Sequence, residues 1–185
     1  GPGSELHRTV DGGETWTKLG EEDGLPAGEL GRTGLAIAAS DPRIVYALVE
    51  AKHSVLLRSD DGGLQFRTVN DKDDVNPRPF YFCDIRVDPA DPNRLYSLHT
   101  VIDVSTDGGR TFRGLAGWDA AHPDHHAMWI DPTEPRRILI GNDGGISTSL
   151  DRGGSWRFCA NLPLAQFYHV AVDTDVPYHV YGGLQ

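Results

Sequence analysis

The sequence has only two cysteines, Cys83 and Cys159, and each lies beside an apolar, strand-like run. Two cysteines so far apart exclude a disulfide-rich scaffold and favour two buried free thiols over a disulfide. No apolar run approaches the roughly 20 residues that a membrane-spanning helix needs. A basic stripe is also lacking, because the net charge is -10 and the basic residues are interspersed among acidic ones. We therefore expect neither a nucleic-acid partner nor a membrane partner.

Turn-forming residues, in contrast, are abundant, with 22 glycines and 12 prolines among 185 residues. This composition is typical of many short strands and not of long helices. Residues 1–4, with the sequence GPGS, resemble a scar left by protease cleavage and cloning, so we exclude them from the domain. We read residues 5–185 as one β segment.

An eight-residue motif, called the octet below, recurs four times with the frame Ser/Thr-x-Asp-x-Gly-x-Thr/Ser-aromatic. The copies are TVDGGETW at 9–16, SDDGGLQF at 59–66, STDGGRTF at 105–112 and SLDRGGSW at 149–156. Gln65 is the one departure at the seventh position. The four aspartates, at 11, 61, 107 and 151, are 50, 46 and 44 residues apart. A repeat of this length indicates one supersecondary unit per copy.

A second motif alternates with the octet and consists of Asp-Pro followed by a β-rich run. The copies are SDPRIVYALVE at 40–50, DPADPNRLYSLH at 88–99, DPTEPRRILIG at 131–141 and the weaker DTDVPYHVYGG at 173–183. Proline fixes φ and ends the preceding strand, so each copy predicts a turn between two strands. Strict alternation of two four-copy motifs indicates that the whole chain is periodic.

The octet has a structural explanation as a hairpin turn. Its Asp can accept hydrogen bonds from N–H groups of its own turn, and its glycines allow positive φ. Its aromatic residue starts the next strand and can fill the gap between neighbouring sheets. We therefore assign a structural and not a catalytic role to Asp11, Trp16, Asp61, Phe66, Asp107, Phe112, Asp151 and Trp156.

One repeat reads as four strands, at 34–40, 44–50, 55–59 and 66–69. Four antiparallel strands per repeat of 40–50 residues predict an all-β fold, a partial β-propeller made of four-stranded blades. We expect three complete blades and two complementary half blades. The complete blades span about 34–69, 82–113 and 127–158, and the half blades span 5–19 and 167–184.

The octets resemble Asp-boxes, the repeat of bacterial neuraminidases. The run DHHAMWIDPTEPRRILIGNDGGISTSLDRGGSW at 124–156, followed by NLPLAQFYHVAVDTDVPYHVYGGLQ at 161–185, resembles the large sortilin-like, glycosyl-hydrolase-like propeller proteins of bacteria. This resemblance implies a propeller fold and an extracellular or periplasmic location. Asp-boxes occur in sialidases, xyloglucanases, sortilins and photosystem-assembly factors, which share architecture but not chemistry.

The two half blades raise the question of how the ring closes. Residues 5–19 supply only the third and fourth strands of a blade, and residues 167–184 supply only the first and second. The chain therefore reads as a fragment of a longer protein. The halves can join within one chain as a four-bladed ring, or be exchanged between two chains as an eight-bladed homodimer. We favour the exchange, because Asp-box propellers usually have six or more blades.

Functional residues are expected on the face opposite the octet turns, where the longer loops gather. Asp84, Asp124 and Asp143 are the candidate catalytic carboxylates, because glycoside hydrolysis needs two carboxyl groups across a cleft. The candidate binding residues are Trp118, His122, His125, His126, Asn142, Tyr168 and His169. Trp118 fits a sugar-stacking platform and a plug between blades equally well. Asn142 and Asp143 lie in GNDGG. We interpret this stretch as a tight turn in preference to the site of a catalytic acid.

Three histidines and an aspartate crowd into residues 122–126 and raise the possibility of a metal site. Asp124, His125 and His126 are the candidate ligands, but their spacing matches no zinc signature. The favoured interpretation is that these histidines bond to neighbouring loop backbone and lock adjacent blades together. We therefore predict no metal and no cofactor.

Two functional hypotheses follow from the sequence. The first is a carbohydrate-acting or carbohydrate-binding protein derived from a glycosyl-hydrolase-like propeller, with no turnover by the isolated fragment. In the family-74 xyloglucanases, which also carry Asp-boxes, the catalytic pair is shared between two propellers, and neither of its aspartates can be matched to a position here. The second hypothesis is a non-catalytic, sortilin-like scaffold that binds a peptide or protein. Paired carboxylates beside exposed aromatic side chains favour the first, and apolar surfaces with free strand edges favour the second.

Overall fold

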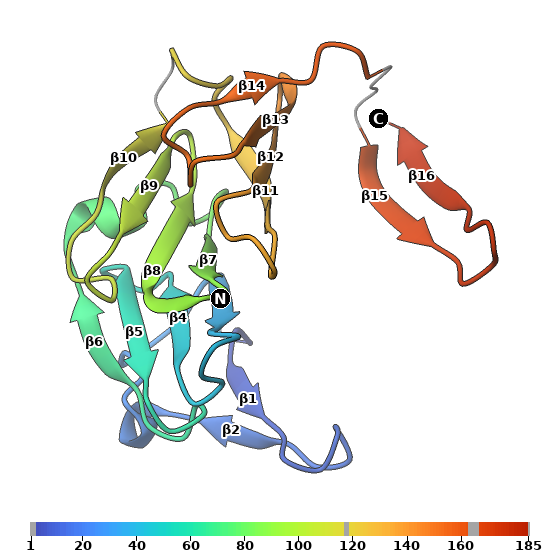
Figure 1. Ribbon diagram of the computed structural model, residues 1–185. Helices are drawn as coiled ribbons and strands as arrows, with labels where there is room; N and C mark the ends of the chain where they lie inside the picture. The colour runs from blue at the N-terminus through green and yellow to red at the C-terminus, as the bar shows by residue number, and fades with distance from the viewer. Residues whose placement is uncertain (1–2, 117–118, 163–166, 185) are drawn as a thin grey trace.

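The computed structural model describes residues 3–116, 119–162 and 167–184, which form a row of antiparallel β-sheets (Figure 1). Three four-stranded sheets are flanked by two two-stranded sheets, which is the predicted partial propeller. Helix is confined, in these ranges, to two single turns, η1 (Glu21–Asp23) and η2 (Asp73–Val75). Across the same ranges no helix is long and apolar enough to span a membrane.

The first complete blade has the strand order β3-β4-β5-β6. These strands span Thr33–Ile37, Val45–Val49, Val55–Ser59 and Arg67–Asn70. Strand β4, with the sequence VYALV, is buried along its whole length because another sheet covers each of its faces. β-Branched and aromatic side chains pack well on a pleated surface, which explains why this segment forms the centre of the blade.

The second and third blades repeat the same order of strands along the chain. In the second blade β7, β8, β9 and β10 span Asp84–Asp88, Asp91–Leu98, Ile102–Ser105 and Arg113–Ala116. In the third blade β11, β12, β13 and β14 span His125–Ile130, Ile138–Asn142, Gly145–Ser149 and Arg157–Phe158. In every blade an Asp-Pro motif joins the first strand to the second, and an octet joins the third strand to the fourth.

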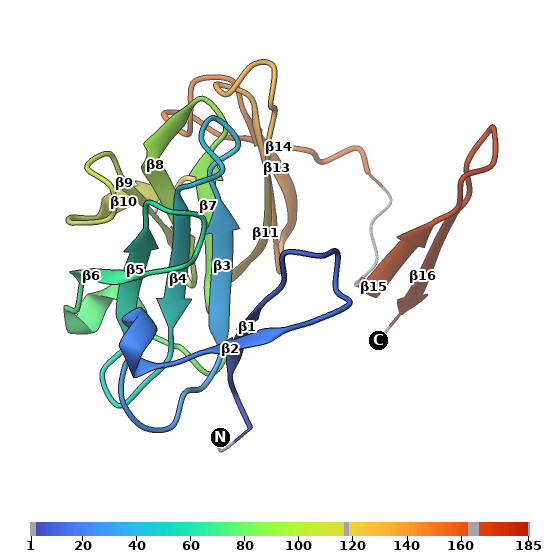
Figure 2. The ribbon, with the colours of Figure 1, turned by 90° about the horizontal axis from the view of Figure 1, so that it is seen from below.

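Each end of the row carries a two-stranded sheet. β1 (Leu6–Arg8) pairs with β2 (Thr17–Leu19) through the first octet, so this hairpin supplies third and fourth strands. β15 (Phe167–Val172) pairs with β16 (Val180–Leu184) around the weak Asp-Pro motif, so this hairpin supplies first and second strands. Figures 1 and 2 both show the β15–β16 hairpin lying apart from the rest of the molecule.

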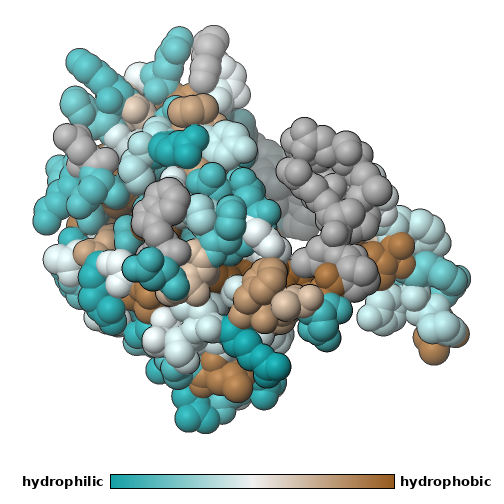
Figure 3. Space-filling model, turned by 90° about the horizontal axis from the view of Figure 1, so that it is seen from above, coloured by the Kyte–Doolittle hydropathy of each residue, from teal (hydrophilic) through white to brown (hydrophobic). Residues whose placement is uncertain are grey.

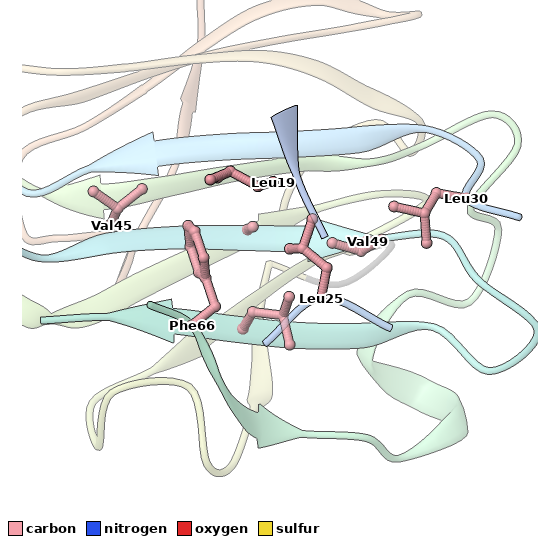
Figure 4. Close-up of a cluster of buried hydrophobic side chains, with 8 residues drawn as sticks. Leu19, Leu25, Leu30, Val45, Val49 and Phe66 are labelled. Carbon is pink, nitrogen blue, oxygen red and sulfur yellow. The ribbon is translucent and has the colours of Figure 1, made fainter. Parts of the chain in front are cut away.

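Neighbouring sheets bury three separate hydrophobic cores between them. The first core lies between β1–β2 and the first blade, where Leu19, Val45, Val49 and Phe66 converge (Figure 4). The second lies between the first and second blades, and the third between the second and third blades. Burial of apolar surface stabilises a sheet by roughly 25 cal/mol per Å², so each blade depends on having a neighbour on both faces.

All four octets form the same hydrogen-bonded turn. In the third copy Ser105 Oγ donates to Asp107 Oδ1 at 2.8 Å, and the backbone N–H of Gly109 donates to Ser105 Oγ at 2.9 Å. The backbone N–H of Thr111 donates to Asp107 Oδ1 at 3.0 Å, and its hydroxyl donates to Asp107 Oδ2 at 2.6 Å. The aspartate is therefore engaged by its own turn on both carboxylate oxygens.

The same bonding recurs in the other copies, with one exception at Gln65. Hydrogen bonds from the Ser155 side chain and backbone lower the pKa of Asp151 to about 2. Gln65 donates its backbone N–H to Asp61 Oδ1 at 3.0 Å, but it has no hydroxyl for the second carboxylate oxygen. Its amide Nε2 instead lies 3.4 Å from Asp23 Oδ1. The second octet therefore lacks the bond from a side-chain hydroxyl to the second carboxylate oxygen, which Thr111 makes in the third copy.

The two cysteines are free thiols, as expected. They are half-buried and not fully buried. Cys83 donates its thiol to the carbonyl of Leu48 at 3.1 Å, so the residue directly before β7 is joined to the neighbouring blade. Burial raises the pKa of the Cys83 thiol, which disfavours the reactive thiolate.

Replacing Gln65 with threonine is expected to stabilise the protein. The new hydroxyl supplies the missing bond to Asp61 Oδ2, worth about 0.5–1 kcal/mol at an exposed site. This corresponds to a rise of about 1–4 °C in Tm for a chain of this length, measured by differential scanning calorimetry. The reciprocal change, Thr111→Gln, removes the equivalent bond and should lower Tm. Equal Tm values for all three proteins would refute this account of the octet.

Candidate functional site

The candidate site lies at the end of the blades opposite the octet turns, and this surface is called the rim below. It is built from the segment between β6 and β7, the start of β11, and the turn between β12 and β13. His122 lies against the β12–β13 turn, because a Cβ added to Gly144 would come within 2.5 Å of the His122 Cβ. Gly144 therefore permits the approach of the loop that precedes β11.

An aromatic cluster forms the centre of this rim. The His126 ring stacks on Phe82 with centroids 5.2 Å apart and lies edge-on to Tyr81 at 5.8 Å. Phe82 is buried, whereas Phe80 and Tyr81 are 69% and 49% exposed. The Arg78 guanidinium lies over the rings of Tyr81 and Phe82, at 5.2 and 5.3 Å from their centroids. Such cation–π contacts hold the arginine and the rings in a common arrangement.

Two side-chain pairs, His126 with Asp143 and Arg78 with Asp124, border the aromatic cluster on the side of the third blade. His126 Nε2 lies 3.2 Å from Asp143 Oδ1, and both side chains are about half exposed. Arg78 Nη1 lies 3.8 Å from Asp124 Oδ1. Arg32 from the first blade donates to the carbonyl oxygens of Phe80 and Tyr81 and so anchors the loop. The rim thus combines exposed rings with groups that can donate and accept hydrogen bonds.

His125, next to this cluster, is buried and connects two blades. Its backbone N–H donates to the carbonyl of His99 at 2.9 Å, and the N–H of Asp124 donates to the carbonyl of Thr100 at 3.0 Å. The His125 side chain is 1% exposed, and its Nδ1 has no hydrogen-bond partner within the described part of the chain. Desolvation, with a further effect of nearby His99, lowers the pKa of His125 to about 4. His125 is therefore a neutral residue between blades at pH 7, and not an exposed base.

The structure brings His122, Asp124, His126 and Asp143 to one rim. Asn142 Oδ1 accepts a hydrogen bond from the N–H of Gly144 at 3.0 Å, as in an ordinary tight turn. Asp84 is paired with Arg86 on β7.

One candidate lies elsewhere, and two have side chains that the structure does not describe. His169 lies on the detached β15–β16 hairpin and is exposed. The backbone of Tyr168 belongs to β15, but its side chain lies outside the described part of the structure, as does Trp118 entirely. Their proposed roles stay predictions.

The sequence places Arg78 and Tyr81 in a longer loop on this face, at 70–81, but assigns no catalytic or binding role to the segment 77–82, PRPFYF, which supplies the aromatic cluster of the rim. Its signal is an arginine between prolines followed by three aromatic residues in a polar loop. Exposed aromatic residues in a loop on a rigid scaffold indicate binding more strongly than the histidines do.

Possible metal ligands gather on the hairpin and not at the rim. Of the residues described, only Asp173, Asp175 and His179 place three ligand atoms within 4.8 Å of one another. Asp173 also accepts hydrogen bonds from the N–H of His179 at 2.9 Å and the hydroxyl of Tyr181 at 3.0 Å. Asp173 Oδ1 also accepts the backbone N–H of Asp175 at 3.2 Å, as Asp41 and Asp131 accept from the residue two positions later in their Asp-Pro turns. A structural role therefore explains the cluster without a metal.

Comparisons with known proteins show the fold and no family. No family model and no curated protein sequence matches the chain. The GH74 xyloglucanase from Xanthomonas campestris is similar in structure, with a TM-score of 0.57 and 18% identity over 76% of this chain. The GH74 enzyme from Niastella koreensis gives the same TM-score and identity over 75%. YCF48 from Cyanidioschyzon merolae gives a TM-score of 0.50 and 14% identity over 72%.

This chain spans only 25%, 24% and 38% of those three proteins, respectively. At such low identity the likeness establishes the β-propeller architecture alone. Activity and ligand therefore have to be argued from the residues at the rim.

The buried His125 predicts a pH dependence of stability. Because the pKa of His125 is lowered to about 4 in the folded state, the unfolded chain takes up a proton between pH 6.5 and 4 that the folded chain does not. Stability is therefore expected to fall as pH decreases through this window, as measured by urea unfolding at pH 7 and pH 4.5. In the variant His125→Gln the decrease should be smaller. An unchanged decrease in this variant would show that other groups cause it.

Proposed function

We propose that the rim around Tyr81 binds a polysaccharide and that the chain is the glycan-binding part of a propeller scaffold. The observation that carries this proposal is the pair of exposed rings, Phe80 and Tyr81, beside the charged groups of Arg78 and Asp143. A sugar ring presents an apolar C–H face and an edge of hydroxyl groups. Exposed aromatic rings match the face, and carboxylate and guanidinium groups match the hydroxyls.

Binding without hydrolysis is the activity that these groups support best. The three candidate carboxylates each face a basic side chain, with Asp124 beside Arg78, Asp143 beside His126 and Asp84 beside Arg86. Such pairs suit carboxylates that orient hydroxyl groups. Two of the similar structures carry the names of GH74 enzymes, one of them a xyloglucanase, so xyloglucan is the first glycan to test. A polysaccharide ligand also fits the extracellular or periplasmic location expected above.

A peptide-binding scaffold is the second candidate function. It is favoured by the open edges of β1 and β16, each of which pairs with one strand only in the described part of the chain. An extended peptide can add itself to such an edge through main-chain hydrogen bonds. Under this alternative the rim aromatics are not needed for binding, which separates it from the glycan proposal.

Truncation of the exposed ring tests the glycan proposal. Tyr81→Ala should weaken binding of xyloglucan, or of another glycan found on an array, by roughly 10-fold or more in Kd, which corresponds to about 1.4 kcal/mol. Isothermal titration calorimetry measures the change. The matched control is Tyr178→Ala, which removes an exposed tyrosine from the β15–β16 hairpin and should leave Kd unchanged.

Equal loss of binding in both variants would point to the hairpin or to folding and not to the rim. Absence of binding to every glycan on the array would overturn the proposal. Binding of a peptide with an affinity that Tyr81→Ala leaves unchanged would support the scaffold alternative.

A further inference from the structure

The outer face of the third blade is apolar and uncovered. Met128, Ile138 and Ile140 turn toward the second blade and belong to the third core. Trp129 and Leu139, which face each other across β11 and β12, point to the opposite side and are 47% and 38% exposed. In the first and second blades the corresponding face is covered by the next sheet along the chain.

The β15–β16 hairpin carries an apolar face that matches this uncovered one. Val172 pairs with Val180, and both are more than 60% exposed, as is Val170. By position in the repeat, Val172 and Val180 correspond to Ile130 and Ile138, which pack in the third core. Figure 3 shows the projecting hairpin with apolar side chains at its surface. The hairpin therefore repeats a face that is buried in a complete blade.

The first octet also carries an exposed apolar side chain, Trp16, at a position that is buried or partly buried in the other octets. In the second octet the aromatic residue, Phe66, is buried between its own sheet and the preceding one. In the fourth octet Trp156 packs partly buried in the third core. Trp16 holds the same position in the first octet and is 58% exposed. It lies on the side of β1–β2 that a preceding sheet would cover.

The open edges of the two hairpins also match in detail. In the first blade, Val45 follows the Asp-Pro turn and faces Ser59, the first residue of the octet, and Tyr46 faces Arg58. Arg58 donates to the Tyr46 hydroxyl at 2.8 Å, with its guanidinium 5.5 Å from the ring centroid. The same positions on the hairpins hold Val180 and Tyr181 on β16, Arg8 on β1 and Thr9 directly after β1.

We propose that β16 of one copy pairs with β1 of a second copy to form a composite blade. Val180 lies opposite Thr9, and Tyr181 opposite Arg8. Arg8 is already directed toward the next blade, because its Nε donates to the carbonyl of Gly62 at 3.1 Å. Arg58 is directed toward the next blade in the same way, through Asn93 at 2.7 Å. The Tyr181 hydroxyl, which donates to Asp173, can then accept from Arg8 as the Tyr46 hydroxyl accepts from Arg58.

A second copy is a better partner for β16 than β1 of the same chain. The cores extend from the inner strands to the outermost ones, with Leu19 of β2 in the first core and Ala116 of β10 in the third. Sheets that touch across their whole width pack face to face. In a ring of four, sheets would meet at roughly right angles, and their outer strands would diverge. Exchange between two copies instead gives two composite blades beside six complete ones.

The proposal is tested by cross-linking the full chain in the stated register. Gly182 is expected opposite His7, so the double variant His7→Cys, Gly182→Cys should form disulfides between copies under mild oxidation. Non-reducing electrophoresis and light scattering should then show a covalent species of twice the 20.2 kDa of one chain. The matched control is His7→Cys, Gly183→Cys, in which the two thiols point to opposite faces of the composite sheet and should cross-link far less.

Each other outcome contradicts the proposal. A disulfide within one chain, seen as an oxidised monomer, would show that β16 closes on its own β1. A monomeric mass for the unmodified protein at high micromolar concentration would exclude exchange between copies. Equal cross-linking in both double variants would show that the register is wrong.

Discussion

The structure depends on one constraint, which is that each blade has two apolar faces and needs a sheet against both. Strand β4 shows this most clearly, because Val45 and Val49 pack in one core while Tyr46 and Leu48 pack in the next. A single hairpin or sheet cannot satisfy this requirement alone, so stability is shared between neighbours, as in other repeat proteins. The exposed side chains at the two ends of the row, among them Trp16 and Trp129, are the places where the requirement is unmet.

The octets lie on one side of the molecule and have a structural role, whereas the rim on the opposite side presents the loops that can bind a ligand. The octet aspartates accept hydrogen bonds within their own turns, so their role is structural; Asp107, for example, binds Ser105 and Thr111 through its two oxygens. The opposite rim is held by contacts between blades, such as the hydrogen bond from His125 N–H to the His99 carbonyl. A rigid framework of this kind lets loops of variable sequence present a binding surface.

The sequence was sufficient to predict the fold because the repeated signals are local. An octet specifies its turn through hydrogen bonds within eight residues, and the spacing of octets then sets the four-stranded blade. The rim was predicted only in part, since it depends on contacts between segments far apart in the chain. His126 and Asp143 were identified as candidates, but their meeting with Tyr81 requires the loop before β7 to fold over β11. The burial of His125 likewise follows from contact with the preceding blade.

Hydrogen–deuterium exchange measured across a dilution series tests the requirement for covered faces most directly. If the hairpins at the two ends complete each other, backbone amides in Val180–Leu184 should be protected at high protein concentration and lose protection on dilution. Amides of Val45–Val49, which a sheet covers on both faces within one chain, should stay protected throughout. Rapid exchange in Val180–Leu184 at every concentration, beside a fully protected β4, would contradict the account.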